Sequence, residues 1–81
     1  MLVEMTEYLV KSLVSEPDMV TVKEFPSDKE DEIIIEVLVS NNDIGKVIGK
    51  GGKNANAIRT LVQANSYLQD NKKVKINIES F

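Results

Sequence analysis

Apolar residues near the start of the chain recur every three or four positions, with charged residues between them. This spacing predicts an amphipathic helix. We expect the helix to end at Ser15 or Glu16, because Pro17 disfavours helical geometry in the residue that precedes it. The apolar positions of this helix are Leu2, Met5, Leu9 and Leu13.

Two stretches rich in β-branched residues follow, and each predicts a strand. Residues 19–25 and 32–40 are separated by the polar segment PSDKED, which indicates a hairpin. The second stretch is apolar at nearly every position, as is typical of a strand buried on both faces, so we expect it at the centre of a sheet. Residues 73–79 (KVKINIE) alternate between polar and apolar side chains and predict a further strand.

Between these strands the pattern returns to helical spacing. Asp43 is a suitable N-cap for a short helix with one apolar face. A longer helix is expected from about residue 53 to residue 69. The apolar positions of the short helix are Ile44, Val47 and Ile48.

The predicted order is α-β-β-α-α-β, which indicates an α+β fold in one domain over residues 1–81. If the helical pair forms a right-handed crossover, residues 33–39 and 73–79 lie parallel in one three-stranded sheet. All three helices then cover one face of this sheet. The opposite face is left to water or to a partner.

All four glycines of the chain lie between Gly45 and Gly52. A glycine after a helix end is typical of a left-handed C-cap, which accounts for Gly49. The three glycines at positions 49, 51 and 52 suggest that something approaches the backbone closely there. Because a helix follows at once, the free amides of residues 52–54 are expected to form an anion site suited to phosphate. A plain turn between two helices is the alternative.

The charges of the chain are unevenly distributed around a net charge of −3. Residues 1–43 hold eleven acids against three bases, whereas residues 44–81 hold seven bases against two acids. This asymmetry favours a polyanion surface in the second half. Solvated side chains without a function are the alternative. The bases around the glycines are Lys46, Lys50, Lys53 and Arg59.

Several classes of function are disfavoured by the composition. The chain has no cysteine and no histidine, so an enzyme, a cofactor or a metal site is not expected. The glycines do not match the nucleotide-binding P-loop motif. Only three residues separate Gly45 from the Gly49-Lys50 pair where the motif has four, and Gly51 occupies the position that requires Ser or Thr. No apolar run is long enough for a membrane span and the start lacks a signal-peptide pattern, which predicts a cytoplasmic protein.

The segment VIGKGGKNANAIRTLV, from Val47 to Val62, resembles the signature of the KH domain, in which a G-x-x-G loop between two helices clamps single-stranded nucleic acid. Gly49 and Gly52 match the paired glycines of this loop, residues 49–52. Ala55 departs from the pattern, since many KH domains carry a larger aliphatic residue there.

The order of the elements is similar to the type II KH arrangement, and the short chain resembles the bacterial KhpA family, also called YlqC. The resemblance implies a cytoplasmic RNA-binding protein that acts as a post-transcriptional regulator or RNA chaperone, linked to cell elongation or division. It also implies a homodimer, or a heterodimer with a KH protein of the KhpB (Jag or EloR) type. Neither a membrane nor a small-molecule substrate is implied.

The resemblance assigns a role to each part of the expected RNA site. The backbone of single-stranded RNA is received by Gly49, Lys50, Gly51 and Gly52, with outer contacts from Lys46, Lys53 and Arg59. An apolar floor is expected from Ile48, Ala55, Ile58 and the sheet edge near Ile35 and Val37. Packing in the core competes with this role at Ile48 and at Ile58, and it is the favoured interpretation for Ile58. Base edges are read by backbone groups and by Asn54 or Asn56.

Two further expectations concern tyrosines and partners. Tyr8 and Tyr67 are expected to pack in the core or in an interface, with base stacking as the alternative. The competing function is a protein-interaction module, in which the fold pairs with a second KH protein and binds little RNA.

Overall fold

The computed structural model describes residues 2–81 and confirms the predicted α+β order. Short 3-10 turns at Pro17–Met19 and Lys50–Gly52 add to this order without changing it. The helices and strands are α1 (Leu2–Lys11), β1 (Thr21–Pro26), β2 (Glu32–Val39), α2 (Ile44–Ile48), α3 (Lys53–Gln69) and β3 (Lys73–Ser80).

The three strands form one mixed sheet in the order β1-β2-β3, with β2 in the predicted central position. β1 runs antiparallel to β2, and β3 runs parallel to it, as the crossover through α2 and α3 requires. Val37 of β2 lies between Val22 of β1 and Ile78 of β3 in the register. Side chains from all three strands therefore reach the same face.

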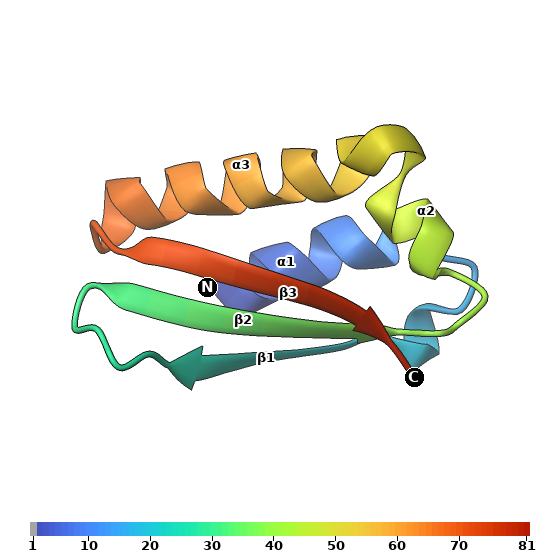
Figure 1. Ribbon diagram of the computed structural model, residues 1–81, viewed down its shortest axis with the longest axis horizontal. Coiled ribbons are helices and arrows are strands. Elements are labelled where there is room, and N and C mark those ends of the chain that lie inside the picture. The colour runs from blue at the N-terminus through green and yellow to red at the C-terminus, as the bar shows by residue number, and fades with distance from the viewer. Residues whose placement is uncertain (1) are drawn as a thin grey trace.

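The hydrophobic core lies between this face of the sheet and the helices. In β2 the odd-numbered residues from Ile33 to Val39 are buried, and the even-numbered ones are only partly buried. Val10 of α1 and Val62 of α3 are fully buried against them. Figure 1 shows α1 and α3 on one side of the sheet, with α2 at its end and the other side uncovered. Within residues 2–81 no helix has the length and apolar character to cross a membrane.

The first helix ends at Lys11, which is earlier than the predicted end at Ser15 or Glu16. A continuing helix would direct the amides of these two residues to carbonyls four positions back. Instead, Ser15 N–H and Glu16 N–H donate to the carboxylate of Asp43, at 3.1 and 3.0 Å. A tertiary hydrogen bond thus replaces a helical one.

Candidate nucleic-acid interface

The GKGG loop joins α2 to α3 through three glycines that all have positive φ. Gly49 has φ 77° and ψ 170°, a region that is almost exclusive to glycine. Gly51 has φ 63° and ψ 19°, and Gly52 has φ 80° and ψ 12°, both in the left-handed region. The predicted helix–turn–helix is therefore present, and its sharp reversal depends on backbone conformations that glycine adopts without strain.

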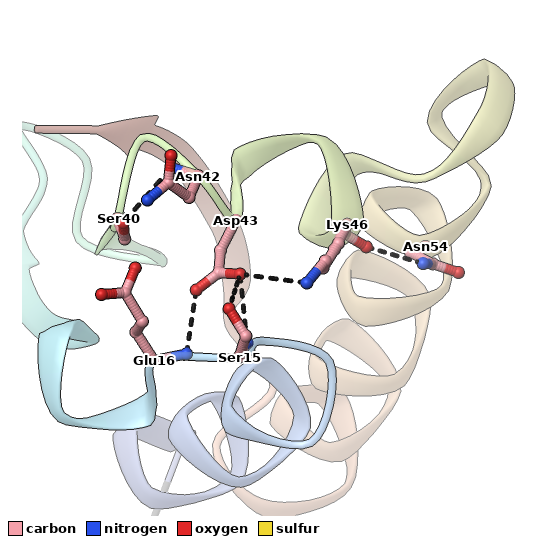
Figure 2. A network of polar contacts seen from close by, with 7 residues as sticks. All are labelled: Ser15, Glu16, Ser40, Asn42, Asp43, Lys46 and Asn54. Carbon is pink, nitrogen blue, oxygen red and sulfur yellow. Dashed lines mark hydrogen bonds and ion pairs between the residues drawn. The ribbon is translucent and has the colours of Figure 1, made fainter.

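Close packing at Gly49 adds a second reason for glycine. A Cβ there would lie 2.8 Å from Cγ and 2.9 Å from the amide nitrogen of Asn54. Asn54 Nδ2 in turn donates to the carbonyl of Lys46 at 2.8 Å, as Figure 2 shows. Asn54 thus bridges the start of α3 to α2 and closes the base of the loop. A Cβ at Gly51, by contrast, would meet open space.

The prediction of three free amides at the start of α3 is wrong for two of them. Gly52 N–H donates to the carbonyl of Gly49 at 3.1 Å. Lys53 N–H donates to the carbonyl of Lys50. Within residues 2–81 no backbone carbonyl accepts from the amide of Lys50 or Gly51. The tip of the loop therefore carries unengaged amides, just before the engaged amides of Gly52 and Lys53.

Asp43 occupies the predicted position before α2, but its side chain does not cap the helix. The fully buried carboxylate accepts from Ser15 Oγ at 2.7 Å and from the amides of Ser15 and Glu16 (Figure 2). Donation from the Ser15 hydroxyl is the main cause that holds the pKa of Asp43 below its ordinary value. These bonds fix α2 to the segment that follows α1, and so they fix one side of the loop.

The four bases around the loop differ in how far they are engaged. Lys46 Nζ lies 3.5 Å from Asp43 Oδ1, although the lysine side chain remains 56% exposed. Arg59 Nη2 donates to the carbonyl of Ile76 in β3 at a long 3.4 Å. Within the described part of the chain no carboxylate forms an ion pair with Lys50, Lys53 or Arg59. Their charge is therefore available to an anion.

The expected apolar floor is not present at the surface. Ala55 and Ile58 are buried, which confirms the core packing favoured for Ile58. Ile35 and Val37 are also buried. They belong to β2, which lies between β1 and β3 and therefore has no free edge. Of the five residues only Ile48 is partly exposed.

The tyrosines do not pack in the core. Tyr8 is 74% exposed and Tyr67 is 54% exposed, so the core interpretation is wrong for both.

Gln63 was not among the predicted residues, yet its side-chain amide bridges α3 to the start of β3. Gln63 Nε2 donates to the carbonyl of Lys72 at 3.0 Å, and Gln63 Oε1 accepts from the amide of Val74 at 2.8 Å. No sequence signal marks this role, because the partners Lys72 and Val74 lie nine and eleven positions later in the chain.

The acidic residues Asp28, Glu30 and Asp31 lie in the β1–β2 turn and Glu32 begins β2, at the opposite end of the sheet from α2 (Figure 1). Ser27 Oγ donates to Glu32 Oε1 at 2.7 Å, which is the main cause that lowers the pKa of Glu32. Among residues 2–81 no group of three or more acids is arranged to hold a metal ion.

Two solved structures of Era share this fold. Aquifex aeolicus Era bound to GDP and AlF4⁻ superimposes with a TM-score of 0.71 at 21% identity, covering 99% of this chain and 30% of that one. Era in complex with MgGDPNP and nucleotides 1506–1542 of 16S ribosomal RNA gives a TM-score of 0.68 at 22% identity, covering 98% and 29%. This chain thus spans less than a third of Era, and the likeness concerns the fold alone.

Sequence relationships are closer. The model of the KhpA/KhpB KH-domain family matches residues 3–78. A protein of Clostridium perfringens named RNA-binding protein KhpA is 48% identical over 75 residues, covering 93% of this chain and 96% of that protein. Its namesake in Borreliella burgdorferi is 40% identical over 76 residues, covering 94% and 89%. The chain, with its GKGG loop between two helices, belongs to the KhpA/KhpB family of KH-domain proteins.

Proposed function

We propose that this protein binds single-stranded RNA by placing the sugar-phosphate backbone against the tip of the GKGG loop. The proposal rests on the hydrogen-bond donors that are unengaged at this tip. Lys50 and Gly51 have unengaged backbone amides, and Gly51 faces open space. The Lys50 ammonium has no carboxylate partner within residues 2–81. The curated relatives, which carry the name RNA-binding protein KhpA, support the choice of RNA.

Each part of the loop has a role in this proposal. The amides of Lys50 and Gly51 and the Lys50 ammonium bind phosphate oxygens, which positions the RNA without reading its sequence. The conformations of Gly49 and Gly52 hold this tip in place. Around it, Lys46, Lys53 and Arg59 provide outer positive charge, and the partly exposed Ile48 contacts a base.

Base reading falls to groups close to the loop. Asn56 is exposed, so its whole amide is available. Asn54 retains Oδ1 and one hydrogen on Nδ2, because the other Nδ2 hydrogen is donated to the carbonyl of Lys46. The outer edge of β3 offers backbone groups as a third reader, since alternate residues of a strand at a sheet edge direct N–H and C=O away from the sheet.

The wider proposal is a single KH domain over residues 1–81 that acts in the cytoplasm as a post-transcriptional regulator or RNA chaperone. It needs no enzymatic activity, cofactor or small-molecule substrate. Binding to one short site gives modest affinity, so a second copy or a second KH protein would raise avidity by linking two loops.

The test replaces Lys50 and Gly51 by Asp and measures binding of fluorescently labelled single-stranded RNA by anisotropy. Two carboxylates at the loop tip repel phosphate, so binding should be lost. A side chain at Gly51 strains its left-handed backbone, but Asp visits this region more readily than most residues and its Cβ meets nothing within 4 Å, so the thermal unfolding midpoint should fall only modestly. Unchanged RNA affinity in this variant would disprove the proposed site.

Pairing with a second copy, or with a KH protein of the KhpB type, is a second proposal. Exposed apolar side chains favour it, since Leu61 and Leu68 of α3 are 49% and 87% exposed. A groove of about 210 Å³ beside Leu61, between α1 and α3, has an almost wholly apolar lining. Sedimentation velocity over a concentration series detects the pairing. If the wild-type protein pairs but binds no RNA, the protein-interaction function replaces the RNA-binding one.

A further inference from the structure

A second hollow lies along the other side of α3, between this helix and the start of β3. It is an open groove of about 440 Å³, larger than the groove between α1 and α3. Arg59 stands near the loop, and Tyr67 is two turns further along α3. The groove is lined by Arg59, Thr60, Gln63, Ala64, Tyr67 and Val74.

The walls of this groove are fixed before any ligand arrives. Gln63 donates to the carbonyl of Lys72 and accepts from the amide of Val74, so it joins the helix wall to the strand wall. Ser66 Oγ also donates to the carbonyl of Lys72, at 2.7 Å. A ligand therefore finds a surface that needs little further ordering, which lowers the entropic cost of binding.

The chemistry of the groove fits a nucleotide. Its one charged lining residue is the cation Arg59, and no carboxylate lines it. Tyr67 is 54% exposed and presents an aromatic side chain on which a base can stack. Arg59 lies six positions after Lys53 in α3 and is one of the proposed outer contacts of the loop. Arg59 therefore belongs both to this groove and to the proposed interface.

We propose that this groove binds the nucleotides adjoining those held at the GKGG loop, with one base stacked on Tyr67. This inference rests on the proposed RNA binding and extends its site along α3. Arg59 and Tyr67 are eight residues apart in one helix, which places them about 12 Å apart along its axis. RNA that ends at the loop does not reach Tyr67, so the contribution of Tyr67 depends on RNA length.

The experiment compares two labelled single-stranded RNA pools of random sequence, four and eight nucleotides long, by fluorescence anisotropy. Tyr67→Ala should weaken binding of the octamer by about 5- to 150-fold, the range given by loss of one base–aromatic stack, and should leave the tetramer unchanged. Tyr67→Phe keeps the ring and should bind both pools as the wild type does. Tyr8→Ala, which removes the other exposed tyrosine from α1, is the matched control and should have no effect.

The outcomes separate this inference from the proposed function. If Tyr67→Ala binds the octamer as tightly as the wild type, while the Lys50→Asp/Gly51→Asp variant does not bind it, the groove proposal fails and the loop site stands. If the loop variant binds both pools normally, the proposed function fails, and wild-type protein that binds neither pool overturns both. Dissociation of a dimer by Tyr67→Ala, seen by sedimentation at the assay concentration, would assign the groove to a second copy and overturn its assignment to RNA.

Discussion

The buried carboxylate of Asp43 accepts hydrogen bonds from both the amide and the hydroxyl of Ser15, 28 positions earlier in the sequence. This contact ends the turn after α1 and at the same time anchors the start of α2. Because α2 leads directly into the GKGG loop, the orientation of the loop depends on a residue that does not itself face RNA in the proposal.

Asp43 makes stability depend on acid pH. Its pKa lies below the ordinary aspartate value of 3.8, so its ionised form stabilises the fold above that value, and the stabilisation is lost as the pH falls towards the lowered pKa. We expect the wild-type thermal midpoint to fall more steeply between about pH 5 and pH 2 than that of Asp43→Asn, which has no carboxyl to protonate. Circular dichroism melts measure this difference. Parallel pH profiles of the wild type and Asp43→Asn would contradict this expectation. The control Glu7→Gln removes a carboxylate from the surface of α1 and should follow the wild type.

Glycine at position 49 is required by both conformation and space. Gly49→Ala should lower the free energy of unfolding by at least about 1–3 kcal/mol, because φ and ψ lie in a region nearly exclusive to glycine. The new Cβ would also meet Asn54 at less than 3 Å. Urea denaturation provides the measurement. Gly45→Ala is the matched control, since a Cβ there meets nothing within 4 Å, and it should stabilise α2 by up to about 1 kcal/mol. Equal effects of the two substitutions would refute this account of Gly49.

Salt dependence reports how many phosphates the loop neutralises. Two or three contacts on a single strand predict a log–log slope of affinity against salt of about −1.5 to −2 for the wild-type protein. Lys50→Asp should reduce the magnitude of this slope by at least about 0.7 and lower the affinity roughly tenfold or more. Anisotropy titrations at several salt concentrations give both quantities. The control Lys29→Asp, an equal charge reversal in the β1–β2 turn, should change neither, and a similar loss in both variants would indicate only a general effect of net charge.

Local pattern predicted much of the fold. The longer helix spans residues 53–69 as expected, because its apolar spacing and the preceding glycines are both local signals. The parallel pairing of β2 with β3 followed from the preferred crossover. The end of α1 was predicted too late in the chain. The amides of Ser15 and Glu16 donate to Asp43, which lies 28 and 27 positions later and is not part of the local pattern.

Sequence alone proposes residues for the candidate site, but not the geometry in which they lie. The loop glycines and the cations are identifiable from composition and spacing. The engagement of the Gly52 amide, the bridge from Asn54 and the burial of Ala55 depend on how α2 and α3 meet, and so they required the structure.

The most direct test of RNA binding at the loop is an NMR titration of the ¹⁵N-labelled protein with short single-stranded RNA. We expect the largest amide shift changes at Lys50 and Gly51, smaller ones at Lys53 and Arg59, and none in the β1–β2 turn. Saturable binding that leaves the amides of residues 49–53 unchanged while it shifts another surface would contradict the account.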